Sequence, residues 1–244
     1  MKINQKGMWL RVIRFGLRQA GRTTDVSSEL EKLAQSLCEL AEHPKFFRQS
    51  LTPVEKVFRD QADLRFNALS VQLAELIEHK LVFESTETWR VVYEQVLQYV
   101  KAQRYLSVAV IRSEDYWRDK PARESLAFNF DMIKHGFHIH RVFIVDDFFW
   151  APSARRPVVQ LYDWIMDQAS YGLEISLVRK SALETETDLI CDFGIYGEEA
   201  VGTQQSDFQG KTTRYEINFE KRAVKEAEDR WDKLLLFVDP LTKL

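Results

Sequence analysis

The sequence predicts a mixed α/β fold, with a mostly parallel sheet that carries helices on both faces and an α-helical hairpin in front of it. Three observations predict this class. From about residue 81 onward, strand patterns alternate with helical patterns, which is typical of α/β proteins. Before residue 80, apolar residues recur at helical spacing. Hydrophobic residues make up 45% and charged residues 29% of the 244 residues, as in globular proteins.

Charge separates the first of three expected segments from the others. Residues 1–22 contain six basic residues and no acidic one, so this segment carries +6. The whole chain carries −3, which leaves −3 − 6 = −9 for the remainder. We expect a basic amphipathic N-terminal helix in 1–22, a helical hairpin in 23–80 and an α/β domain in 81–244.

The four arginines at 11, 14, 18 and 22 share one side of the expected helix, opposite Val12, Ile13 and Leu17. Such a helix is typical of one that lies on an anionic membrane surface, with a tryptophan at the interface. The apolar side could instead pack on the chain's own helices, or the segment could be an organelle transit peptide. The candidate residues for membrane or partner binding are Trp9, Arg11, Arg14, Arg18 and Arg22.

Two helices account for the hairpin. Apolar residues recur at helical spacing over 26–42, and this pattern ends before Pro44. The second helix begins at Thr52, where Glu55 completes a capping box, and continues to about Lys80. Two helices joined by a short connection pack most simply as an antiparallel hairpin.

Strands and helices then alternate to the end of the chain. Runs rich in β-branched and aromatic residues predict strands at 81–84, 105–111, 138–146, 173–179, 188–196, 199–204 and 212–218. Helical periodicity predicts helices near 89–100, 122–135, 156–171 and 219–236. Gly136 and Gly172 are placed to end two of these helices, since glycine readily adopts the left-handed conformation of a C-cap.

Several stretches of 81–244 together carry a family likeness. They are Tyr105-Leu-Ser-Val-Ala-Val, Asp115-Tyr-Trp117, Asn129, Gly136-Phe-His-Ile-His-Arg141-Val-Phe-Ile, Asp188-Leu-Ile-Cys-Asp192-Phe-Gly-Ile-Tyr196, and Phe219 with Trp231-Asp-Lys-Leu-Leu. These stretches resemble the phospholipase D-like fold as it occurs in non-catalytic regulatory domains. The resemblance covers about two thirds of the chain and implies the family's α/β fold.

The family's enzymes cleave phosphodiesters with the motif His-x-Lys-x-x-x-x-Asp, in which the histidine attacks phosphorus. None of the five histidines of this chain begins the full motif. The resemblance therefore implies a degenerate active site without catalytic residues. We expect a non-enzymatic sensor or interaction protein. The alternative is a phosphodiester-cleaving enzyme whose site is completed by dimerisation.

Six residues are candidates for ligand binding. Asp146 and Asp147 lie at the carboxyl end of the strongest strand pattern, where open α/β sheets bind ligands. His138 and His140 could contribute to a metal site, but local hydrogen bonding is the preferred interpretation, so no metal and no cofactor are expected. The candidates are Trp117, Asn129, His138, Arg141, Asp146 and Asp147, although Trp117 could instead cover the core.

Composition also bounds location and partners. Cys38 and Cys191, the only cysteines, are far apart, which favours a reducing, cytoplasmic setting; peripheral membrane association is the alternative. We expect a protein partner or an anionic membrane surface, with a homodimer as a further alternative. The acidic remainder disfavours nucleic acid. A winged-helix reader in 51–84 conflicts with the acidic residues Glu55, Asp60, Asp63, Glu75 and Glu78.

Overall fold

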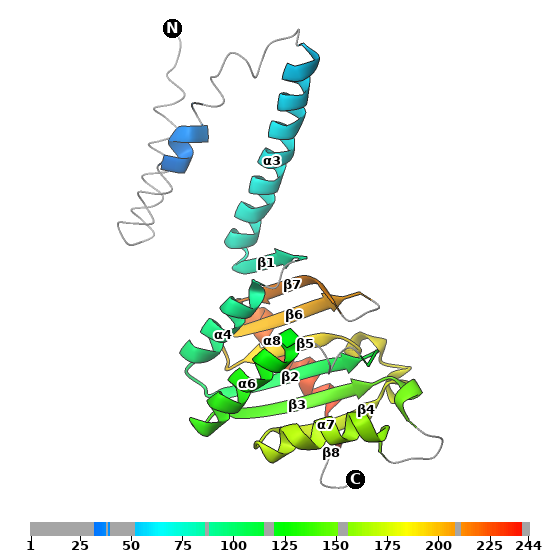
Figure 1. Ribbon diagram of the computed structural model, residues 1–244. Coiled ribbons are helices and arrows are strands. Elements are labelled where there is room, and N and C mark those ends of the chain that lie inside the picture. Colours follow the sequence, from blue (N-terminus) through cyan, green and yellow to red (C-terminus); the bar gives the residue numbers. More distant parts are fainter. Residues whose placement is uncertain are drawn as a thin grey trace. The chain divides into compact units, whose positions relative to one another are not determined.

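The computed structural model describes residues 32–37, 39, 52–85, 88–114, 120–150, 156–207 and 211–240 (Figure 1). The chain divides into two compact units, Met1–Leu69 and Ser70–Leu244. The basic segment 1–22 lies outside the described residues, so its helix remains a prediction. Within the described part of the chain, no helix combines the length and the apolar character that crossing a membrane requires.

Helix α3 spans Pro53–Ile77 and begins with the expected capping box. The Thr52 backbone N–H donates to Glu55 Oε2 at 2.9 Å, and the Glu55 N–H donates to Thr52 Oγ1 at 3.3 Å. Residues 32–37 and 39 of the preceding predicted helix are helical. A single 25-residue helix in this position contradicts a winged-helix reader in 51–84, which needs several short helices.

One sheet of eight strands forms the centre of the second unit, in the order β1-β7-β6-β5-β2-β3-β4-β8. The strands in chain order are β1 (Lys80–Glu84), β2 (Arg104–Ile111), β3 (His138–Val145), β4 (Glu174–Arg179), β5 (Asp192–Tyr196), β6 (Ala200–Ser206), β7 (Thr212–Asn218) and β8 (Asp239–Pro240). The mixed α/β class with a preceding helix is therefore confirmed.

The expectation of a mostly parallel sheet is wrong. Only the β2–β3 and β3–β4 pairs are parallel, and the other five strand pairs are antiparallel. The length of the connections explains four of these seven pairs. Helices join β2 to β3 and β3 to β4, whereas short turns join β5 to β6 and β6 to β7, and a short turn can only return the chain antiparallel.

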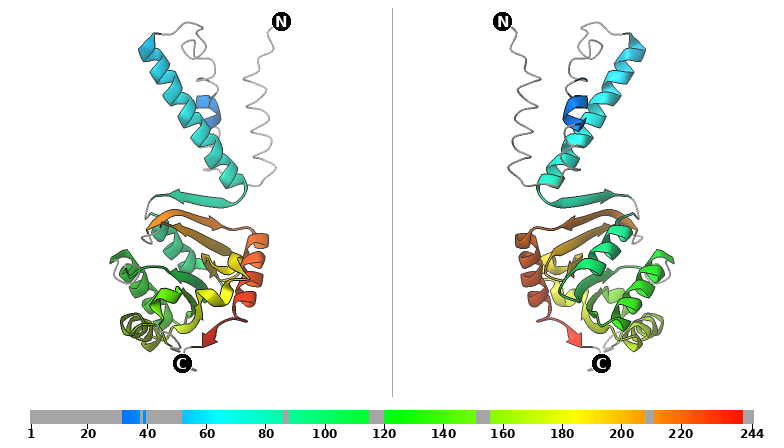
Figure 2. Two further views of the ribbon diagram at one scale, coloured as in Figure 1. Left: turned by 90° about the vertical axis from the view of Figure 1, so that its right-hand side faces the viewer. Right: turned by 90° about the vertical axis from the view of Figure 1, so that its left-hand side faces the viewer.

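Helices cover both faces of this sheet, as expected (Figure 2). On one face lie α4 (Trp89–Tyr99), α6 (Lys120–Lys134) and α7 (Val159–Ser170), and on the other lies α8 (Lys221–Leu234). Side chains alternate along β2: Tyr105 and Ala109 pack beneath the three helices, whereas Leu106 and Val108 pack against α8. Residues 142–145 of β3 are fully buried between these two layers.

Some element boundaries differ from the sequence expectation. Helix α7 begins at Val159 rather than near 156, because Pro157 forms a β-bridge with Trp150. Strand β5 begins at Asp192 rather than 188, because the residues before it form the 3₁₀ helix η4 (Thr187–Leu189). Two further 3₁₀ helices are η2 (Asp147–Phe149) and η3 (Lys180–Leu183). Strand β8 was not expected.

Candidate functional site

The structure describes five of the six ligand-binding candidates and distributes them over separate places. Trp117 lies outside the described residues. His138 is the first residue of β3 and Asp146 follows its last, so the two lie roughly 25 Å apart at about 3.3 Å per residue. Asn129 and Arg141 lie between the sheet and its three covering helices. The candidates therefore form two groups and one isolated histidine.

The first group is a charge network at the carboxyl ends of β2, β3 and β4. Asp146 Oδ2 accepts a hydrogen bond from Lys180 Nζ at 2.9 Å, and this bond holds the pKa of the Asp146 carboxyl below its ordinary value. Asp147 accepts two bonds from Ser181, one from the backbone N–H at 2.9 Å and one from the hydroxyl at 2.5 Å. Both aspartates thus fix the loop that follows β4.

Asp192, at the start of β5, extends this network toward β2. Its Oδ1 accepts the Val110 backbone N–H at 2.8 Å, and its Oδ2 lies 3.1 Å from Arg112 Nη1. Asp192 is 9% exposed, and its burial raises the pKa of its carboxyl above the ordinary value. Asp192 was not a sequence candidate for the site, because it is 80 residues from Arg112 along the chain.

The charges at this edge pair with one another. Lys180 neutralises Asp146, Arg112 neutralises Asp192, and the Arg179 guanidinium lies 4.4 Å from the centre of the Trp150 ring. A charged ligand could bind at this edge by replacing one partner of an ion pair, for example Asp146 beside Lys180. The Ser181 hydroxyl donates its hydrogen bond to the Asp147 carboxylate.

The described histidines have their contacts elsewhere. His138 Nε2 lies 2.9 Å from Glu174 Oε2, and His140 Nε2 lies 3.0 Å from Ser176 Oγ, both at the amino ends of β3 and β4. The His140 ring meets the Trp231 ring edge-on, and burial lowers the pKa of His140. Within the described ranges, no three His, Cys, Asp or Glu side chains are grouped so that they could hold a metal ion.

One histidine carries part of the phospholipase D motif in the sequence. His43 is followed two residues later by Lys45, which is the His-x-Lys spacing, but Ser50 occupies the position of the motif's aspartate. This segment lies outside the described residues. The motif is therefore incomplete at the one histidine with the correct lysine spacing.

The second group is a buried polar network beneath α4, α6 and α7. The Tyr93 hydroxyl donates to Asn129 Oδ1 at 2.6 Å. Arg141 donates from Nε to Ser107 Oγ and from Nη1 to Gln168 Oε1, both at 2.9 Å. Tyr105 lies between the two halves: its ring packs against Tyr93, with 5.8 Å between ring centroids. Burial raises the pKa of its hydroxyl, and the Arg141 charge opposes this.

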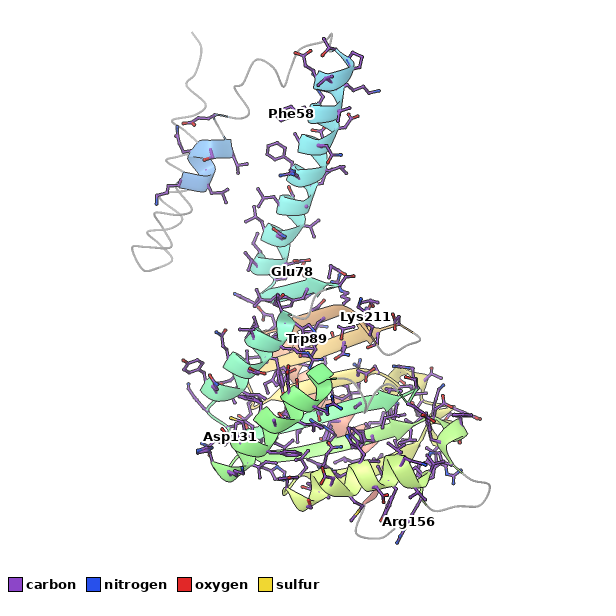
Figure 3. The ribbon with its side chains drawn as sticks, viewed as in Figure 1. Phe58, Glu78, Trp89, Asp131, Arg156 and Lys211 are labelled. Carbon is purple, nitrogen blue, oxygen red and sulfur yellow. The ribbon has the colours of Figure 1, made fainter. Side chains whose placement is uncertain are left out.

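Further aromatic residues pack beside this network, toward β7. Tyr196 and Tyr215 share a hydrogen bond between their hydroxyls. Trp89, which is labelled in Figure 3, stacks on Tyr215 with 4.1 Å between ring centroids. Gly202 makes room for both hydroxyls, because an added Cβ would lie 2.5 Å from Tyr196 Oη. Sequence reasoning missed this cluster. The available signal was the occurrence of tyrosine and glycine at alternate positions of one predicted strand, Gly194 and Tyr196.

No family model and no curated protein matches this chain. Among solved structures, TrmBL2, an archaeal chromatin protein described with a novel mode of DNA binding, shares 13% identity over 87% of this chain and 69% of its own, with a TM-score of 0.44. Nuc from Salmonella typhimurium, a phospholipase D family member, shares 11% identity over 66% of this chain and 96% of its own, with a TM-score of 0.45. NucT from Helicobacter pylori shares 8% identity over 66% and 98%, with a TM-score of 0.44. These likenesses define neither an activity nor a ligand for this chain.

Proposed function

We propose that this chain is a non-enzymatic sensor or interaction protein, built on a phospholipase D-like α/β domain that lacks the family's catalytic residues. One observation carries the proposal: each described histidine has its partners away from the charge network at the carboxyl ends of the parallel strands. A histidine nucleophile is what the family's phosphodiester cleavage needs. The paired charges at that edge are suited to binding rather than to bond cleavage.

The basic segment supplies the docking element in this proposal. Residues 1–22 carry +6 and the remainder −9, so the two parts favour different partners. Trp9 and the arginines at 11, 14, 18 and 22 would contact an anionic membrane surface or an acidic protein partner. The α/β domain would respond to a ligand while the basic segment holds the protein at its site of action.

The absence of catalysis is tested with a generic chromogenic phosphodiester. We expect the pure, folded full chain to produce no turnover above a sample without protein. Turnover that disappears on His138→Ala or His43→Ala would instead establish the alternative, a phosphodiesterase completed by dimerisation. Measuring the molar mass of the same sample by light scattering would then show whether the active species is a dimer.

Docking is tested by removing residues 1–22. We expect the truncated chain to lose binding to phosphatidylcholine vesicles that contain phosphatidylserine, with an unchanged thermal unfolding midpoint. Vesicles of phosphatidylcholine alone are the control, because they lack the anionic headgroup. Retained binding, or unfolding of the truncated chain, would reject the docking role. A lower thermal unfolding midpoint of the truncated chain would show that the segment packs on the protein itself.

A further inference from the structure

Arg141 is a half-buried cation whose hydrogen-bond partners are neutral. It lies in the middle of the sheet on β3, opposite Ser107 of β2, and its side chain reaches the end of α7. The partners of its guanidinium are the Ser107 hydroxyl and the Gln168 side-chain carbonyl, and the Phe143 ring centre lies 6.0 Å away. Among the residues that the structure describes, no aspartate or glutamate forms an ion pair with it.

This setting differs from that of three other arginines in contact with the sheet. Arg112 pairs with Asp192, Arg104 with Glu228, and Arg214 with Glu84. A guanidinium keeps its proton at any physiological pH, so it cannot avoid the cost of burial by becoming neutral. A buried charge is ordinarily compensated by an opposite charge. At Arg141 that opposite charge is not supplied by the described part of the chain.

The neighbours of Arg141 hold its guanidinium in a fixed orientation. Gln168 is 1% exposed and is held by a bond from its Nε2 to the Trp164 carbonyl, which directs its oxygen toward Arg141. The Tyr105 hydroxyl lies beside the guanidinium. The guanidinium has five N–H donors, of which two are used by Ser107 and Gln168. The remaining donors, with a tyrosine hydroxyl beside them, suit an anion with two oxygen acceptors.

We propose that Arg141, with Tyr105, Ser107 and Gln168, binds a small anion that carries a carboxylate or phosphate group. The half-buried guanidinium would form the charge-assisted bonds, and the buried neutral partners would hold its orientation. This site is separate from the charge network at the carboxyl ends of the strands. The inference goes beyond the proposed function and holds whether or not the chain cleaves phosphodiesters.

The direct test measures the thermal unfolding midpoint of the full chain in inorganic phosphate and, separately, in acetate. Sodium chloride keeps the ionic strength equal, so that general salt effects cancel. We expect at least one anion to raise the midpoint saturably, because a ligand that binds only the folded state stabilises it. The anion that does so identifies phosphate or carboxylate as the preferred group. No rise with either anion would overturn the proposal.

Two substitutions assign the effect to this site. Arg141→Met removes the charge, and we expect it to abolish the rise; Arg123→Met, on the exposed side of α6, is the matched control and keeps it. Arg141→Lys keeps the charge but loses the forked donor geometry, and we expect about tenfold weaker binding. A rise that persists in Arg141→Met would reject the site.

Gln168→Glu supplies Arg141 with an acidic partner and leaves the arginine in place. The new carboxylate would stand 2.9 Å from Nη1, where Gln168 Oε1 now lies, and would occupy the guanidinium. We expect this variant to fold and to lose the anion response, even if Arg141→Met does not fold. Gln160→Glu adds the same charge at an exposed position of α7 and should keep the response. An unchanged response in Gln168→Glu would overturn the proposal.

Discussion

The Tyr93 hydroxyl on α4 donates a hydrogen bond of 2.6 Å to Asn129 Oδ1 on α6. The two residues are 36 positions apart in the chain, and both side chains are buried, with Asn129 1% exposed. This bond connects two helices that cover the same face of the sheet. It also adjoins the polar network that contains Arg141, since the Tyr105 ring packs against Tyr93 and its hydroxyl feels the Arg141 charge.

Asn129→Ala should destabilise the protein by about 1 to 3 kcal/mol, because it leaves the buried Tyr93 hydroxyl without its acceptor. Urea unfolding of the variant measures the change in the free energy of unfolding. Asn129→Ala combined with Tyr93→Phe should cost less than the sum of the single changes, since the two groups share one bond. Tyr99→Phe, at an exposed position of α4, is the control. Additive costs would contradict the bond.

Gly202→Ala should destabilise the protein by about 1 to 3 kcal/mol through overpacking. A Cβ at this position would lie 2.5 Å from Tyr196 Oη, and the Tyr215 hydroxyl is also in its way. The thermal midpoint reports the change. Thr203→Ala, at an exposed position of the same strand, should leave the midpoint nearly unchanged. A neutral Gly202→Ala variant would show that the tyrosine pair can move aside.

Asp192→Ala should destabilise the protein by about 3 kcal/mol, because it leaves the buried Val110 N–H without an acceptor and Arg112 without its ion pair. Asp192→Asn should cost less, since an amide oxygen can still accept from Val110. Guanidinium unfolding compares the two variants. Asp188→Ala, an exposed aspartate nearby, should change stability by no more than about 0.5 kcal/mol. Equal costs at 192 and 188 would refute the structural role.

His140 should make stability depend on pH below its ordinary pKa of 6.5. Burial lowers the pKa of His140 in the folded protein, although the neighbouring Glu174 partly opposes this and His138 adds to it. As the pH falls below 6.5, the unfolded chain takes up a proton that the folded protein still excludes, so stability decreases until the folded pKa is reached. Above pH 6.5, where His140 is neutral in both states, the protein has its full stability with respect to this group.

The test compares the free energy of unfolding at neutral pH with that in mildly acidic buffer. We expect His140→Gln to reduce the difference between the two, because glutamine does not take up the proton. His135→Gln, at the exposed end of α6, controls for the removal of an imidazole elsewhere. If the acid-induced loss is as large in His140→Gln as in the unsubstituted chain, His140 is not its source.

Local patterns predicted most elements of this protein. The capping box of Thr52 and Glu55 marks the start of α3, and Gly136 and Gly172 adopt the positive φ angles that follow α6 and α7. The strands were found because apolar and β-branched residues are concentrated in them. These signals depend on residues a few positions apart, so the sequence suffices to recognise them. For the same reason, the sequence alone shows that the complete phospholipase D motif is absent, since the motif spans only a few consecutive positions.

Strand direction and the candidate sites depended on the tertiary structure. Strand β5 pairs antiparallel with β2, and Asp192 meets Arg112 only through this pairing. Likewise, Arg141 comes to lie among neutral partners because β2, β3 and α7 meet at Ser107 and Gln168. The order of strands follows from burying all apolar faces together, which is a property of the whole chain. No local pattern of residues records which distant side chains this packing makes neighbours.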